Sequence, residues 1–488
     1  MKKIHVIGAG PGGLSAALLL QARGFDVTLF EKDDRVGGRS KNIQLGDYRF
    51  DLGPTFLMYI DVLKQVFSRA GFRLEEELEL MPLNPLYTLV FKDEHLSLSA
   101  NPEENVAIFD RIEPGLGVSY QRWLTDQELK MLKIKSILEK PFPSFFHLFR
   151  KDVLKAAGVA HLSKSVYTML QTYSKHKTFI HSLSFQAKYL GMASYQAPSI
   201  FTILPYLEHV TGLYHVKGGL NQINQKLAEL FKERGGTLRL SSPVKEILIE
   251  KKRFKGVLLE SGEAQYADLV VMNADFAYGM THLIEQKHLR KYRKEKIEKK
   301  KYSVSTWMMY LGINKELDLP HHEILFSDDY DQYLKDLMNQ KLTDDISIYV
   351  HNPSKIDDSL APAGKSALYI LVPVPNVASN ISWEAQESGI KERVFEKIKE
   401  KHGLDLKPYI EEMRTYSPKD WMNQENVYLG AVFNLAHGLD QMLFLRPHNQ
   451  FEDIKGMYLV GGGTHPGSGL PTIYQSALIA DDLIANLK

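Results

Sequence analysis

A glycine-rich segment between a short apolar strand and a helix constrains this chain more than any other feature. Gly8-Ala9-Gly10-Pro11-Gly12-Gly13 follows the β-branched run Ile4–Ile7, which is typical of a buried parallel strand. The sequence predicts a helix over Leu14–Arg23, with Gly24 as its C-cap, and a second strand over Val27–Glu31. The N-terminus is therefore predicted to form a β-α-β unit.

The spacing of the glycines indicates what this unit binds. Gly8, Gly10 and Gly13 fit G-x-G-x-x-G: the first permits a tight turn, the second lets a pyrophosphate approach the backbone, and the third lets helix and strand pack closely. The helix would direct its first N–H groups at the phosphates. Glu31 ends the next strand, where a carboxylate accepts from ribose hydroxyls and repels a 2′-phosphate. The alternative is a purely structural glycine turn.

Two further glycine-rich segments fit the same dinucleotide site. In Arg35–Ser40, a Gly-Gly pair could approach the pyrophosphate from its other side while Arg39 supplies charge. Val460–Pro471, followed by a helix predicted near Thr472–Leu487, would place a second helix N-terminus against the ligand. An ordinary surface turn and a ligand-free loop are the respective alternatives.

The length of 488 residues exceeds that of a usual single core, so at least two lobes are expected. An α/β pattern in residues 1–100, 211–300 and 416–488 predicts one discontinuous dinucleotide-binding domain of Rossmann type. Residues 101–210 have a mostly helical pattern and are predicted to contact substrate and membrane. Residues 301–415 mix strands and helices and are predicted to form a substrate-binding domain.

Composition excludes several classes of protein. The chain has no cysteine, which removes disulfides and thiolate chemistry and fits a reducing compartment. A net charge of +1 gives no general attraction to nucleic acid. No apolar run reaches the roughly 18 residues of a transmembrane helix, and the N-terminus resembles a strand rather than a signal peptide. We therefore expect a cytoplasmic protein with only peripheral contact to the cell membrane, no nucleic-acid partner and no metal.

Taken in order, six motifs resemble the bacterial carotenoid desaturases of the phytoene desaturase type over nearly the full length. They are Gly8–Gly13, Glu31, Val36–Arg39, Phe50–Thr55, Lys217–Gly219 and Gly463–Pro471. The C30 branch, the 4,4′-diapophytoene (dehydrosqualene) desaturases, is the most similar. Its resemblance is carried by Gln196–Ser199, Glu208–Gly219, Ile324–Asp329 and Ser359–Gly364.

This resemblance implies an α/β fold like those of glutathione reductase and the amine oxidases. A Rossmann-type FAD-binding lobe would be interleaved with a mixed substrate lobe and a helical membrane-facing region, with a long apolar tunnel for a polyene. Val244 would lie near adenine, and Leu470 and Pro471 beside the flavin. The implied FAD contacts are Gly8, Gly10, Gly13, Glu31, Lys32, Gly38, Arg39, Gly53, Pro54, Thr55, Val244, Gly462, Gly463, Gly467, Leu470 and Pro471.

Dehydrogenation of a polyene transfers a hydride to the flavin and a proton to an acceptor. Asp152 and Lys155, one helical turn apart, resemble an acidic and basic pair of the desaturase family; the alternative is an exposed i,i+3 ion pair. His465 would lie near the flavin edge; the alternative is a histidine that only hydrogen-bonds backbone. No second nucleotide site is visible, so oxygen or a quinone is the expected electron acceptor.

Charge also favours contact with a membrane. Residues 126–182 hold ten Lys or Arg against four Asp or Glu, interleaved with aromatic residues. A basic helix predicted over 287–301 holds nine against two. For this second segment, a solvated helix face is the favoured interpretation.

Desaturation of a C30 precursor to diaponeurosporene or diapolycopene is the leading hypothesis, with a C40 phytoene desaturase as a close alternative. An oxidase of terminal carotenoid methyl groups is disfavoured by Thr464 and His465 before Pro466-Gly467. An amine oxidase would show an aromatic cage, whereas the tail has only Tyr474 after the glycine-rich turn. A prenyl-binding module without enzymatic activity would not need complete nucleotide motifs.

Overall fold

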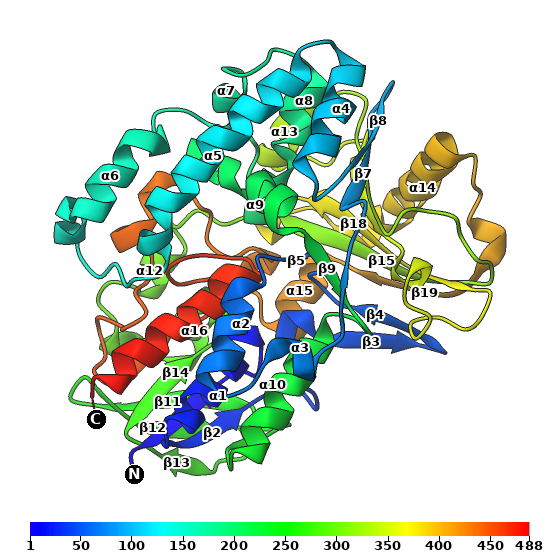
Figure 1. The fold of residues 1–488 in the computed structure, drawn as a ribbon. Helices are drawn as coiled ribbons and strands as arrows, with labels where there is room; N and C mark the ends of the chain where they lie inside the picture. The colour runs from blue at the N-terminus through cyan, green and yellow to red at the C-terminus, as the bar shows by residue number, and fades with distance from the viewer. Residues whose placement is uncertain (488) are drawn as a thin grey trace.

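The computed structural model describes residues 1–487, and one lobe is built on a five-stranded parallel sheet (Figure 1). The strand order is β10-β2-β1-β14-β20, and each neighbouring pair is parallel. One sheet thus joins the start, the middle and the end of the chain, as the interleaved α/β pattern predicted. The bounds are β1 Lys3–Ile7, β2 Asp26–Phe30, β10 Thr237–Arg239, β14 Leu269–Met272 and β20 Met457–Leu459.

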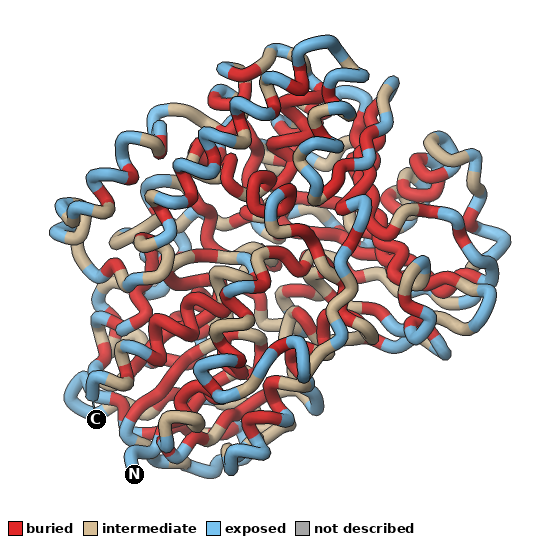
Figure 2. The backbone as a smooth tube through the Cα atoms, in the orientation of Figure 1, coloured by how far each residue is buried: buried red, intermediate tan, exposed pale blue. Residues whose placement is uncertain are grey.

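Both faces of this sheet are covered, and all residues of β14 and β20 and all but the first of β1 are buried (Figure 2). Helices α1, α2, α10 and α16 share one buried core with Ile4 and Val6 of β1. An antiparallel sheet, β11-β12-β13, packs through another core against Ile7 and Phe30. The bounds are α1 Pro11–Ala22, α2 Asp61–Arg69, α10 Asn221–Glu233, α16 Leu470–Ala485, β11 Val244–Glu250, β12 Arg253–Leu259 and β13 Ala264–Tyr266.

The second lobe is built on a mixed sheet of seven strands, in the order β19-β15-β18-β17-β16-β7-β8, with α14 on one face. β7 and β8 fall inside the segment 1–100 predicted for the dinucleotide-binding domain, but β7 pairs with β16. All four β7 residues are buried, as expected for a strand between two neighbours in this sheet. The bounds are β7 Tyr87–Val90, β8 His95–Leu98, β15 Ser305–Ile313, β16 His322–Leu325, β17 Ile348–His351, β18 Ser366–Val374, β19 Ile410–Tyr416 and α14 Trp383–His402.

Residues 101–210 are mostly helical, which confirms the prediction from their pattern. These helices surround a large core that includes Phe109, Trp123 and Phe179 and continues to β7. Within residues 1–487, no helix combines the length and the apolar character needed to cross a bilayer. The bounds are α4 Pro102–Ile112, α5 Leu116–Leu138, α6 Lys151–Ala160, α7 Val166–Leu170, α8 Lys177–Ser182 and α9 Ile203–Thr211.

The prediction of a basic helix over residues 287–301 is wrong. Only a 3-10 turn, Gln286–His288, and the short helix α12, Lys294–Ile297, form there. Like charges four residues apart repel one another in a helix. In addition, the Asp453 carboxylate accepts the backbone N–H groups of Arg290 and Lys291, each at 2.8 Å, and holds them outside a helix.

Two helices begin earlier than predicted. Helix α1 starts at Pro11 rather than Leu14, and α16 starts at Leu470 rather than Thr472. Each has a proline in its first turn, where the missing N–H costs nothing. Both helix N-termini therefore reach further into the glycine-rich turns that precede them.

Candidate functional site

A cavity of about 650 Å³ is lined by residues of both lobes. One part of its wall is made by the three glycine-rich segments, which lie far apart in the sequence. Another part is apolar and comes from α5, α9 and strands of the seven-stranded sheet. Its volume lies in the range of roughly 300–1,000 Å³ that is typical of small-molecule sites.

The first glycine motif forms the turn between β1 and α1. A Cβ atom at Gly13 would fall far inside contact distance of the Gly8 carbonyl oxygen. A Cβ atom at Gly10 or Gly12 would lie 2.9 or 2.6 Å from the side-chain amide of Asn273. Gly8, Gly10 and Gly12 line the cavity, whereas Gly13 lies behind them. Gly13 thus serves the packing of helix on strand, and Gly10 and Gly12 let Asn273 pack against the turn at the cavity.

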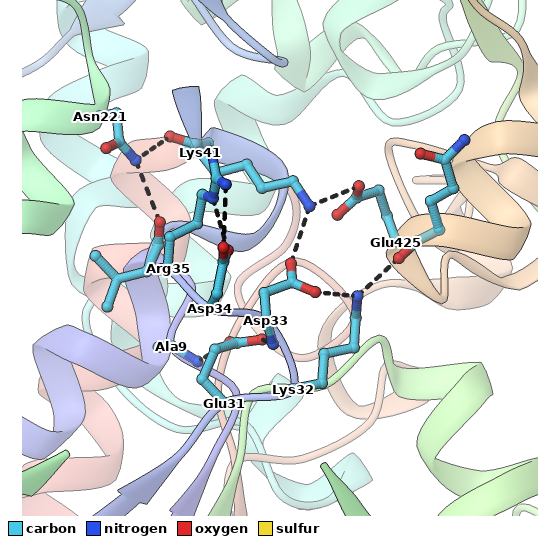
Figure 3. A network of polar contacts seen from close by, with 12 residues as sticks. Ala9, Glu31, Lys32, Asp33, Asp34, Arg35, Lys41, Asn221 and Glu425 are labelled. Carbon is cyan, nitrogen blue, oxygen red and sulfur yellow. Dashed lines mark hydrogen bonds and ion pairs between the residues drawn. The ribbon is translucent and has the colours of Figure 1, made fainter. Parts of the chain in front are cut away.

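Glu31, directly after β2, is fixed at the edge of the cavity (Figure 3). Its two carboxylate oxygens accept the backbone N–H groups of Ala9, at 2.7 Å, and Asp33, at 3.0 Å. Burial raises the pKa of Glu31, and these two hydrogen bonds oppose that rise. Beyond it, Lys41 bridges Asp33 and Glu425 at 2.9 and 2.8 Å, which ties this edge to α15, Pro418–Glu425.

Asn273 and Asp275 are site residues that the sequence analysis missed. They follow β14, so the carboxyl end of a central parallel strand places them at the cavity. Burial raises the pKa of Asp275, which accepts from Asn434 at 2.8 Å and lies 3.5 Å from Arg39. Arg39 also donates to the Val432 carbonyl at 2.7 Å. In the sequence, the only signal for these two residues was that they follow an apolar strand, Leu269–Met272.

A buried arginine holds the C-terminal glycine segment in shape. Arg446 has no exposed surface and donates to the carbonyls of Gly462, at 2.7 Å, and Thr464, at 3.1 Å. The backbone N–H of Ser468 donates to His437 at 3.0 Å. The first turn of α16 lines the cavity beside the first turn of α1.

The apolar part of the cavity wall includes two lysines, Lys135 of α5 and Lys188. Lys188, on the 3-10 helix Phe185–Leu190, has its ammonium 5.1 Å from the Tyr330 ring and 5.7 Å from the Phe326 ring. Burial lowers the pKa of Lys188 to about 7. The apolar residues of this wall include Met131, Leu138, Phe185, Phe201, Leu204 and Leu207.

The predicted catalytic residues lie outside this lining, within the part of the chain that the structure describes. Asp152, on α6, pairs with Arg150 and accepts from Ser136 at 3.0 Å; chiefly the Arg150 hydrogen bond lowers its pKa to about 2. Lys155 lies on the same helix. His465 is buried and hydrogen-bonds the Lys140 carbonyl at 3.0 Å, and burial lowers its pKa to about 4.

Every residue predicted to hold FAD lines the cavity except Gly13. Their contacts with a bound ligand remain a prediction. The sequence analysis missed further lining residues from segments without a glycine motif. These are Pro243, Glu260, Ala274, Tyr278, Thr306, Met308, Trp421, Glu425, Val432 and Asn434.

Comparison with known proteins gives a consistent result. Residues 11–484 match the family model for flavin-containing amine oxidoreductases. A 4,4′-diapophytoene desaturase (4,4′-diapolycopene-forming) from Methylomonas sp. is 42% identical, over 99% of this chain and 95% of the relative. An all-trans-zeta-carotene desaturase from Myxococcus xanthus is 36% identical, over 99% and 93%. A solved structure of an oxidoreductase from Methanosarcina mazei aligns with a TM-score of 0.66 at 18% identity, over 100% of both chains, and shows the shared fold.

Proposed function

Because the chain belongs to the carotenoid desaturases, a branch of the flavin-containing amine oxidoreductases, we propose that it introduces double bonds into the C30 precursor 4,4′-diapophytoene. The protein is an FAD-dependent oxidoreductase that acts on CH–CH bonds. The products are diaponeurosporene and diapolycopene. The observation that carries the proposal is that one cavity joins the glycine motifs to an apolar wall.

The residues present fit FAD. Two helix N-termini, of α1 and α16, lie at the cavity and would hold the pyrophosphate and the flavin, since unpaired N–H groups favour negative charge. Glu31 would bind ribose hydroxyls. Gly8, Gly10 and Gly12 line the cavity without a side chain, so a pyrophosphate could approach the backbone there. When bound, FAD accepts the hydride that leaves the substrate carbon.

The apolar wall binds and orients the substrate. A hydrocarbon offers no group for hydrogen bonding, so its affinity comes from burial, at roughly 0.8 kcal/mol for each CH₂. Phe185, Phe201 and Leu207 are side chains of this wall. They exclude water and hold one C–C bond in place beside the cofactor.

Lys188 is the proton acceptor in this proposal. It is a base in the apolar wall, and burial lowers its pKa to about 7, so a large share of the amine is neutral near neutral pH. Asp152 lies on α6 in an ion pair with Arg150, away from the lining. Because it lies outside the lining, the predicted pair of Asp152 and Lys155 is the second candidate for the proton acceptor. Lys188→Met and Asp152→Asn distinguish the two candidates.

We also propose that the protein is cytoplasmic and attaches peripherally to the membrane through the 3-10 helix Phe145–Phe149. All three of its phenylalanines are exposed, Phe145 by 51%, Phe146 by 80% and Phe149 by 61%. Lys151 and Lys155 follow on α6, and positive charge favours anionic lipid. Met131 and Leu138 of the adjacent α5 line the cavity, which supports an entrance for a lipid-dissolved substrate on this side.

The test is conversion of a colourless precursor in vesicles by the purified FAD-loaded protein. We expect 4,4′-diapophytoene to yield products with longer-wavelength, structured absorption, resolved by chromatography. Phytoene, supplied in a parallel sample, should react more slowly; faster reaction would establish the C40 alternative. No conjugated product from the C30 precursor, or oxygenated end groups formed only on a finished polyene, would overturn the proposal.

A further inference from the structure

Behind the cavity wall, three buried histidines from three distant segments meet. His215 belongs to β9, Leu213–Val216, His321 directly precedes β16, and His351 ends β17. One ligand nitrogen from each lies within 4.8 Å of the other two. Their exposed fractions are only 3%, 9% and 3%. We call these three residues the histidine cluster.

The geometry of two of these rings fits a shared ion. The Nε2 atoms of His321 and His351 face one another at 3.3 Å, with ring planes at 78°. Two nitrogen ligands of a tetrahedral ion, each bonded at about 2.0–2.1 Å, lie about 3.3–3.4 Å apart. The spacing therefore suits two ligands of one metal as well as it suits a hydrogen bond.

Some ring nitrogens in and beside the histidine cluster make no hydrogen bond. His321 Nδ1 is buried without a partner, and so is Nε2 of the adjacent His322. A buried nitrogen without a partner costs free energy, so an arrangement of several such rings is poorly explained by hydrogen bonding alone.

A carboxylate completes the surroundings. Asp357, with no exposed surface, accepts from His215 Nε2 at 2.8 Å. It is held in turn by the backbone N–H of Gly218, at 2.7 Å, and the Ser359 hydroxyl, at 2.6 Å. Histidines that bind metals commonly donate their other N–H to such a carboxylate, which fixes the ring and raises its basicity as a ligand.

We propose that His215, His321 and His351 bind one divalent transition-metal ion of the class that prefers imidazole nitrogen, with Zn²⁺ as the first candidate. A water molecule would complete the four-coordinate shell. This site is separate from the desaturase reaction and does not rest on the proposed substrate. The site departs from the expectation of no metal. Residues 215, 321 and 351 lie far apart in the sequence, so no short ligand motif marks them.

The role of the ion is structural. It would join β9, which pairs with β5, Leu57–Met58, and β6, Leu80–Pro82, to the seven-stranded sheet. The next layer toward the cavity is His322, which stacks on Phe56 at 4.4 Å and hydrogen-bonds Tyr349 at 2.7 Å. Phe56 and Tyr349 both line the cavity. The ion would therefore stiffen one wall of the substrate site from behind.

The first test is the metal content of the FAD-loaded full chain, prepared without a histidine tag and analysed by inductively coupled plasma mass spectrometry. We expect about one zinc per chain in the wild type and below about one tenth in His321→Gln and His351→Gln. His5→Gln, a buried histidine of β1, and His95→Gln, an exposed one on β8, are the controls and should keep the metal. Flavin absorbance shows whether each variant is folded.

A second measurement does not depend on any variant. Dipicolinate should strip the wild type and lower its Tm by several degrees, and added Zn²⁺ should restore it. The stripped protein loaded with Cu²⁺ should show imidazole nitrogen couplings by electron paramagnetic resonance. Absence of metal together with an unchanged Tm on adding Zn²⁺ would overturn the proposal, as would equal metal content in His321→Gln.

Discussion

The Glu31 carboxylate accepts the backbone N–H of Ala9 across 2.7 Å, which ties the end of β2 to the glycine turn after β1. Its other oxygen accepts the N–H of Asp33. The side chain is only 5% exposed, so the backbone fixes the carboxylate before any ligand binds. The edge of the cavity where a ribose is expected is therefore preorganised, and cofactor affinity should be sensitive to this one residue.

Glu31→Gln should weaken FAD binding. The amide of glutamine has one acceptor oxygen in place of two. One of the backbone N–H groups of Ala9 and Asp33 would therefore face an NH₂ group. A buried N–H without a partner costs about 1–3 kcal/mol of free energy. The negative charge toward the ribose is lost as well. We expect the FAD Kd to rise about 10- to 100-fold, measured by fluorescence titration of the apoprotein. The control Glu263→Gln, at an ion pair with Arg239 on the surface, should bind FAD like the wild type. If Glu31→Gln also bound FAD with wild-type affinity, Glu31 would not be a cofactor-binding residue.

Gly13→Ala should prevent α1 from packing on the sheet. The new Cβ would overlap the Gly8 carbonyl oxygen, which is backbone and cannot rotate away. We expect a loss of about 3 kcal/mol or more in the free energy of unfolding, with little flavin retained, measured by urea denaturation and absorbance. Gly158→Ala is the matched control, because its Cβ meets nothing within 4 Å and α6 gains a better helix former. A normally stable Gly13→Ala protein would refute the packing role.

The sequence alone predicted those structural elements that are determined by residues close to one another in the chain. The strand, glycine turn and helix at each end of the chain follow from local spacing, and the helical character of 101–210 follows from its composition. Asn273 and Asp275 had only the end of a predicted strand as a signal, and Lys188 had none, because the packing of helices against the seven-stranded sheet brings it to the cavity. The same applies to β7, whose partner β16 lies over 200 residues away, and to 287–301, where Asp453 overrides a helical pattern.

Lys188 makes stability depend on pH. Its pKa is about 7 in the folded protein against 10.5 as the ordinary value, because burial disfavours the ammonium. Between these values the unfolded chain binds more protons, so this residue makes the free energy of unfolding rise with pH. Lys188→Met should therefore be more stable than the wild type at pH 7 and below, by at most about 5 kcal/mol. The difference should shrink toward pH 10.5, as followed by urea denaturation across this range.

The activity of the same variant tests its proposed role. If Lys188 accepts the proton, kcat/KM of the wild type rises with pH through about 7, and Lys188→Met loses most of the activity and this rise. Lys175→Met, at an exposed lysine, should change neither stability nor the pH profile. A Lys188→Met enzyme with a wild-type profile, together with an inactive Asp152→Asn, would transfer the role to the pair on α6.

Replacement of Phe145, Phe146 and Phe149 by serine should release the protein from membranes. Full burial of one phenylalanine contributes roughly 1.5–3 kcal/mol, so three partly inserted rings should change the vesicle partition coefficient about 100-fold or more. Co-sedimentation with vesicles that contain phosphatidylglycerol measures this directly. The control replaces Tyr266, Tyr409 and Met413, which are exposed on other parts of the molecule, and should partition like the wild type. Because the cavity is unchanged, the triple variant should convert substrate normally in detergent micelles and poorly from vesicles; equal binding to vesicles would exclude this surface as the attachment site.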